Sequence, residues 1–175
     1  MQRIRLYGAD CNQSALVLDA IQQTKVNMTV YLGNYAAFND NNVAYNRQRD
    51  EIDSVLKTFG ADKIQGITVG NEFMLNYLTT NGASDPNGAV GNQGAALLIA
   101  DINDTKSNIS GLGLSKTIPI GNADAGAFFN TQVLQSVSYG VRSLQRYYYF
   151  SVLSLTPAFG VYRCPMCIPG SLMYR

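Results

Sequence analysis

The feature that most constrains the fold is an alternation that repeats along residues 3–140. Each of four units begins with a short apolar, strand-like run and continues into apolar residues at helical spacing. The strand-like runs cover 3–9, 28–33, 64–70 and 117–121. The helical segments lie at about 15–21, 45–59, 92–109 and 129–137. Consecutive strand–helix units predict an α/β fold with a parallel sheet and right-handed crossovers.

Polar residues recur where each predicted strand ends. They are Asp10, Asn34, Asn71, Glu72, Asn122 and Asp124. Because parallel strands have their carboxyl ends on one side of the sheet, these side chains are expected along one rim. Taken singly, each is equally well explained as a turn or cap residue. Their recurrence in four units indicates a ligand site.

Composition limits the chemistry that such a site can perform. The chain has no histidine, which excludes Ser-His-Asp and Cys-His nucleophile systems and any histidine-ligated metal. Its only glutamates are Glu51 and Glu72. A net charge of +1 gives no electrostatic argument for nucleic acid as a partner. No apolar run approaches the roughly 18 residues of a membrane-spanning helix.

Two other kinds of site are disfavoured by short motifs. Cys164 and Cys167 have CxxC spacing, but one such pair without histidine is half a zinc site at best. Pro165 and Pro169 argue against the helix that a redox CxxC would open. A Rossmann-type nucleotide domain is the rival fold, yet neither GxGxxG nor a P-loop occurs. We therefore expect no metal and no cofactor.

Glu72 has the surroundings of a proton donor. A glycosidase needs two carboxyl groups beside the scissile bond, one of them a donor with a raised pKa. Glu72 follows an apolar strand, where partial desolvation favours the protonated carboxyl group. Asn71 beside it could hydrogen-bond a sugar hydroxyl. A carboxylate that merely starts a helix is the alternative interpretation.

Residues 3–12 (Arg-Ile-Arg-Leu-Tyr-Gly-Ala-Asp-Cys-Asn) and 67–72 (Ile-Thr-Val-Gly-Asn-Glu) resemble glycoside hydrolase family 17, in its fungal β-1,3-glucanase branch. The resemblance implies a partial (β/α)8 TIM barrel covering the second to fifth strands. It also implies retaining hydrolysis of β-1,3-glucan, with Glu72 as acid/base. The substrate-binding residues expected from the rim and the resemblance are Asn71, Asp10, Tyr7, Asn34, Asn122 and Asp124.

The chain departs from that family in one decisive respect. The family's nucleophile is a glutamate after the seventh strand, and here no glutamate follows Glu72. We therefore expect little hydrolytic activity from this chain, and marginal stability or association from its open sheet edges. The family is typically secreted or attached to the cell wall, and four Asn-x-Ser/Thr sequons permit that compartment.

Residues 141–175 lack the periodicity of the preceding units. Every acidic residue precedes position 141. We predict a partial barrel over 1–140 and an irregular, non-family tail over 141–175, for which retained-intron sequence is one hypothesis. The scattered arginines and tyrosines of the tail are thin support for a nucleic-acid platform. For the whole chain, the alternatives to a hydrolase are a catalytically dead β-glucan-binding module and a non-functional gene-model fragment.

Overall fold

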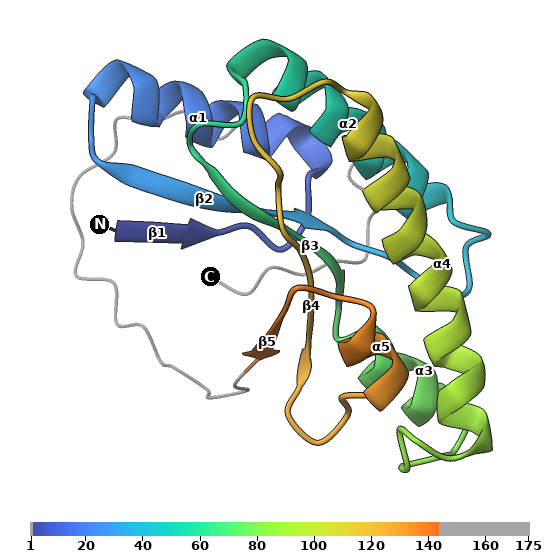
Figure 1. Cartoon of the computed structure of the whole chain (residues 1–175). Helices are drawn as coiled ribbons and strands as arrows, with labels where there is room; N and C mark the ends of the chain where they lie inside the picture. Colours follow the sequence, from blue (N-terminus) through green and yellow to red (C-terminus); the bar gives the residue numbers. More distant parts are fainter. Residues whose placement is uncertain (1, 144–175) are drawn as a thin grey trace. The chain divides into compact units, whose positions relative to one another are not determined.

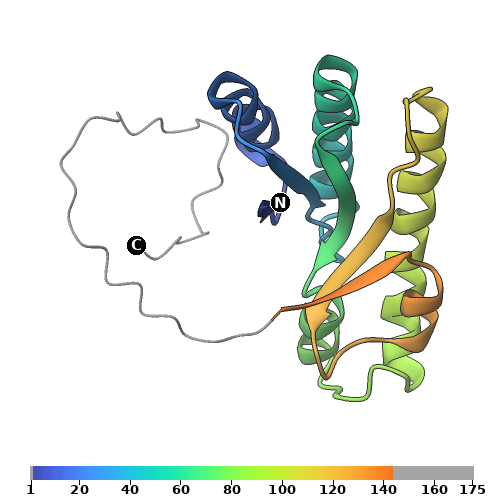
Figure 2. The ribbon, with the colours of Figure 1, turned by 60° about the vertical axis from the view of Figure 1, so that its left-hand side comes forward.

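The computed structural model describes residues 2–143, and its strands form one parallel sheet. The sheet order follows the chain: β1 (Gln2–Arg5), β2 (Met28–Asn34), β3 (Ile64–Asn71), β4 (Ile120–Ala125) and β5 (Tyr139–Ser143). Figures 1 and 2 show that the sheet of paired strands is twisted and curved, as an open half-barrel is. The CxxC pair and most of the expected tail lie outside the described residues.

Three long helices lie side by side along one face of the sheet (Figures 1 and 2). They are α1 (Gln13–Thr24), α2 (Val43–Phe59) and α4 (Ala89–Gly111). Two shorter helices, α3 (Phe73–Thr80) and α5 (Thr131–Gln135), pack against α4, and a 3-10 turn (Asp10–Asn12) precedes α1. Within residues 2–143, no helix has the length and apolarity needed to cross a membrane.

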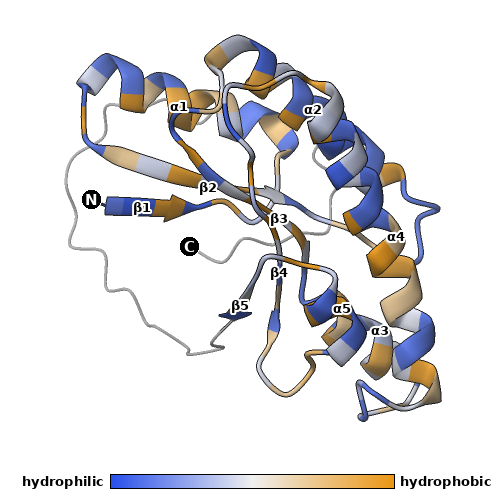
Figure 3. Ribbon diagram, in the orientation of Figure 1, coloured by the Kyte–Doolittle hydropathy of each residue, from blue (hydrophilic) through white to orange (hydrophobic). Residues whose placement is uncertain are grey.

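The core lies between the sheet and this helix layer. On α2, the buried residues Tyr45, Ile52, Val55 and Leu56 fall on one face at helical spacing. They pack with strand residues such as Leu32 in the same apolar cluster. Figure 3 shows hydrophilic and hydrophobic residues alternating around the helices, as expected for elements with one face in water.

Tyr139 of β5 covers the opposite, inner face of the sheet. A Cβ atom at Gly121 of β4 would overlap the Tyr139 ring, and one at Gly66 of β3 would lie 2.7 Å from its hydroxyl oxygen. The ring meets Tyr31 of β2 edge-on, with 5.4 Å between ring centroids. Its hydroxyl group is 3.2 Å from Thr68 Oγ1. Glycines on two adjacent strands, Gly66 of β3 and Gly121 of β4, therefore make room for the Tyr139 ring, which reaches from β5 to Tyr31 of β2.

The structure confirms the partial barrel and adds elements that the sequence pattern missed. Helix α3 was not expected, and β4 begins at Ile120 instead of Thr117. Strand β5 pairs in parallel with β4 and runs across position 140. The expected boundary at that position therefore falls inside a strand. If β3 is the fourth barrel strand, the described strands are the second to the sixth.

Candidate active site

A kink at the end of β3 turns the chain toward the rim of the sheet. The β3–β4 register shifts between Val69 and Asn71, and Gly70 between them has φ of 77°. Glycine adopts this left-handed backbone without strain. Asn122 Nδ2 donates a hydrogen bond of 2.9 Å to the Val69 carbonyl oxygen, which secures β4 beside the kink.

Glu72 follows this kink and begins α3. Its backbone N–H donates to the Ala123 carbonyl oxygen of β4 at 2.9 Å. Its own carbonyl accepts the N–H of Asn76 at 3.0 Å. With φ of 56°, Glu72 has left-handed backbone, which is uncommon outside glycine. The half-buried glutamate is thus fixed on both sides at a strand end.

Asp124 lies beneath the first turn of α3, with none of its surface exposed. Its carboxylate accepts backbone N–H groups from Met74 at 2.8 Å and Leu75 at 3.3 Å, and also from Ala125 at 2.9 Å. Burial raises the pKa of Asp124 to about 6, against the opposing effect of these hydrogen bonds. No side chain caps α3 from its own N-cap position, so Asp124 supplies the missing acceptor from β4.

Arg5 connects β1 to the site. Its Nη2 donates to Asn71 Oδ1 at 2.9 Å, and its guanidinium carbon lies 4.5 Å from the centre of the Tyr7 ring. Burial lowers the pKa of Arg5, and the nearby Tyr7, Tyr139 and Glu72 act in the opposite sense. Tyr7 is 61% exposed. Arg5 therefore places Asn71 and Tyr7 on the same rim as Glu72. Sequence reasoning had not singled out Arg5, although a charged residue alternating with apolar ones in a strand was a usable signal.

The other expected substrate-binding residues are buried or paired within the protein. The side chains of Asn34, Asn122 and Asp124 are each 0–1% exposed. Strand alternation also puts Asn122 and Asp124 on the face opposite Gly121, toward the helices. Asp10 forms a two-pronged ion pair with Arg47 of α2, at 2.7 and 2.9 Å. In this structure the buried side chains of Asn34, Asn122 and Asp124 are not accessible to a sugar.

A hollow of about 300 Å³ lies between the loop after β2 and helix α3. Its lining combines aromatic rings with amides and a hydroxyl group. These residues include Tyr35, Phe38, Asn39, Phe73, Asn76 and Thr80. Buried Gln48 fixes the Tyr35 backbone: its Oε1 accepts the Tyr35 N–H at 3.0 Å and its Nε2 donates to the Tyr35 carbonyl at 3.3 Å. The hollow is therefore preformed.

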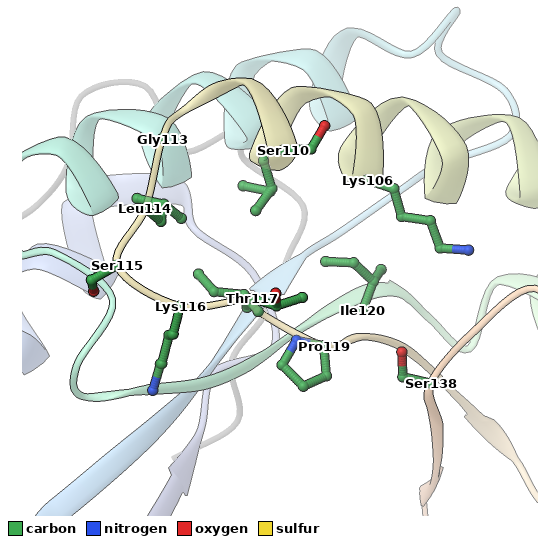
Figure 4. A pocket seen from close by; sticks show the side chains of 12 residues that line it. Lys106, Ser110, Gly113, Leu114, Ser115, Lys116, Thr117, Pro119, Ile120 and Ser138 are labelled. Atoms are coloured by element: carbon green, nitrogen blue, oxygen red, sulfur yellow. The ribbon is translucent and has the colours of Figure 1, made fainter.

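A larger hollow, of about 710 Å³, lies at the other end of β4 (Figure 4). It is lined by the last turns of α4, the loop 112–119 and Ser138 at the start of β5. Because α5 has only five residues, this crossover leaves the face beside Ile120 uncovered. The hollow holds none of the rim residues, so we place the candidate active site at the carboxyl ends.

Parallel strands joined by helices, with an Asn-Glu pair at the end of a central strand, define part of a (β/α)-barrel enzyme. Residues 1–150 match the model of the BtgE/BtgC glycoside hydrolase domain. The chain belongs to this glycoside hydrolase family, as the resemblance read from residues 3–12 and 67–72 indicated.

Known proteins agree with this assignment. The chain is 29% identical over 147 residues to btgC of Aspergillus niger, provisionally assigned as a glucan endo-1,3-beta-glucosidase. That match covers 83% of this chain and 19% of the relative.

Two solved structures share the fold. A β-1,3-glucanosyltransferase of Rhizomucor miehei, solved as an active-site mutant with laminaritriose, aligns with a TM-score of 0.56 and 22% identity, over 79% of this chain and 44% of that one. An endo-laminarinase from Formosa Hel1_33_131 aligns with a TM-score of 0.57 and 17% identity, over 80% and 40%. The chain thus spans less than half the length of each of these three proteins.

Proposed function

We propose that this chain is the acid/base half of a β-1,3-glucan-cleaving barrel, with Glu72 as the proton donor to the leaving oxygen. The observation that carries the proposal is the position of Glu72. It ends a central parallel strand, fixed to Ala123 on β4 and flanked by Asn71, whose amide oxygen is held by Arg5. The A. niger relative and both solved relatives bear names or titles that refer to β-1,3-glucan or its hydrolysis products.

The rim around Glu72 suits a polysaccharide. An exposed Tyr7 ring offers a face for stacking on a pyranose, while the Asn71 amide offers hydrogen bonds to hydroxyl groups. The hollow lined by Tyr35 and Asn76 offers an aromatic ring and an amide on the segments that follow β2 and β3. We infer a secreted or cell-wall setting, where β-1,3-glucan occurs. Detection of N-linked glycan on the secreted chain would test that setting.

Cleavage requires a second carboxyl group. In the family that the sequence resembles this group is a glutamate after a later strand, and the other glutamate here, Glu51, lies on α2 before Glu72. The proposal therefore assigns the nucleophile to barrel sequence that this chain does not contain. By itself, the chain is expected to bind glucan without releasing sugar.

Laminaritriose titration of the purified 175-residue chain, followed by calorimetry, tests the proposal. Asn71→Ala and Tyr7→Ala should each weaken binding about tenfold, the equivalent of one lost contact of about 1.4 kcal/mol. Glu51→Gln is the matched control and should bind as wild type. Absence of laminaritriose binding refutes the glucan assignment. Sugar release from laminarin by this chain refutes the missing nucleophile.

A further inference from the structure

Asp124 is a buried carboxylate next to the β4 residue that hydrogen-bonds to Glu72. The proposed reaction gives Asp124 no role. It is fully buried, so it cannot contact a polysaccharide. It lies on β4, one residue after Ala123, whose carbonyl oxygen accepts the Glu72 N–H. A buried carboxylate is costly unless it is hydrogen-bonded. The groups that bond to it therefore indicate what it does.

Those groups belong largely to the first turn of α3. The first N–H groups of a helix lack partners inside the helix. Here Met74 and Leu75 direct theirs to the two carboxylate oxygens of Asp124, at 2.8 and 3.3 Å. Glu72 is the N-cap residue of α3, and its own side chain makes no cap hydrogen bond. The side-chain cap of α3, which an N-cap residue usually provides, therefore comes from Asp124 on β4.

We propose that Asp124 is a positioning residue for Glu72: it replaces the side-chain cap of α3 from β4 and holds the glutamate in its left-handed backbone conformation. This inference rests on the proposed function, because it concerns how the acid/base glutamate is held. Two consecutive residues of β4 then fix the junction, with the Ala123 carbonyl binding Glu72 and the Asp124 carboxylate binding the turn after it.

The two carboxyl groups are also electrostatically linked. Within the described residues, Glu72 is the charged side chain that acts on Asp124. Its charge adds to the effect of burial and raises the pKa of Asp124 further. The other groups that bond to Asp124 are backbone N–H groups. Protonation of Asp124 near pH 6 weakens its hydrogen bonds to α3, so the surroundings of Glu72 should change in the same pH range.

The chain has only two glutamates, which makes a direct test possible. With carbon-13 in glutamate carboxyl groups alone, the protein gives two signals, assigned by Glu72→Gln. Between pH 4 and 8, the Glu72 signal should show a step at the Asp124 transition near pH 6. The Glu51 signal should not. A Glu72 signal without a step near pH 6 overturns the proposal.

Variants separate positioning from general stability. Asp124→Asn should abolish the step, whereas Asp101→Asn should leave it intact. Asp101 is a matched control because it is also buried, with its pKa raised by burial to about 6, but lies on α4. A step that persists in Asp124→Asn overturns the proposal. If that variant does not fold, the wild-type titration and the Asp101→Asn control still decide.

A binding measurement keeps the two proposals apart. Asp124→Asn should weaken laminaritriose binding about tenfold, and Asp101→Asn less than twofold. If wild type does not bind laminaritriose, the proposed function fails while the carboxyl signals still report on Asp124. The other outcome is that wild type and Asp124→Asn bind laminaritriose equally well and that the Glu72 signal of the variant keeps its step near pH 6. That result refutes the positioning role, and the proposed function stands.

Discussion

Gly121→Ala fills the space beneath the Tyr139 ring and should lower the free energy of unfolding. When Tyr139→Ala removes the ring as well, the alanine at position 121 should no longer be destabilising. In Gly121→Ala, the added methyl group would overlap the ring carbons of Tyr139. The ring is confined by Tyr31 on β2 and by Thr68 on β3. Its displacement therefore disturbs two other strands.

The magnitudes follow from this geometry. Overpacking by one methyl group costs about 1–3 kcal/mol, so Gly121→Ala should lose about 2 kcal/mol of unfolding free energy. Tyr139→Ala should lose about 3 kcal/mol, near the lower limit for large aromatic residues because the ring is only half-buried. In the double variant the overlap is gone, and the alanine gains about 0.5 kcal/mol over glycine by restricting the unfolded chain. The coupling between the two sites is then about 2–3 kcal/mol.

Urea unfolding followed by circular dichroism measures the four members of this cycle. Gly111→Ala is the matched control, since a Cβ atom there meets no neighbouring atom within 4 Å, and it should not lower stability. Additive losses at Gly121 and Tyr139, within about 0.5 kcal/mol, would show that the ring does not occupy the space above Gly121.

Two further predictions concern pH and the kink. Burial raises the pKa of Asp101 to about 6, above the unfolded value of about 3.9. The folded chain therefore holds that proton more tightly, and this contribution to stability is present at pH 4 and is lost as pH rises to 6. The difference in unfolding free energy between wild type and Asp101→Asn, measured by urea titration, should change by about 2–3 kcal/mol over that range. A difference that does not vary with pH contradicts the assigned burial of Asp101. Gly70→Ala places a side chain at φ of 77°, 3.0 Å from Leu98, and should cost about 1–3 kcal/mol. It should also weaken laminaritriose binding, while Gly60→Ala, with a similar φ of 69° and open space around it, should cost stability but leave binding unchanged.

The sequence predicted those elements whose pattern is strong by itself. Apart from Gln65, the run 64–70 consists of apolar or small residues, as expected of a strand covered on both faces, and residues 45–59 repeat at helical spacing. Both occur close to their expected bounds. Strand β5 has no such pattern, because Gly140 and Arg142 interrupt it. It is a strand because its backbone pairs with β4. The local sequence does not reveal such pairing with a neighbouring strand.

The polar residues that the sequence singled out occupy different positions in the structure. Asn34 and Asn71 end their strands, whereas Asp10 lies in the turn before α1. Asn122 and Asp124 were read as residues following a strand, yet they lie within β4 and face the helices. Their burial depends on backbone partners at Val69 and Met74, some 50 residues earlier. Spacing along the chain cannot reveal such partners.

The hydrogen bonds that fix Glu72 have a consequence for the order of folding. Two of the bonds that join this region to β4, from Asn122 to Val69 and from Met74 to Asp124, span 53 and 50 residues. All of these partners exist once synthesis has passed Ala125. Because the amino-terminal parts of a chain fold first during synthesis, the backbone geometry of Glu72 can be established before any later strand leaves the ribosome. A nucleophile supplied by later sequence would then dock against an acid group that is already in place.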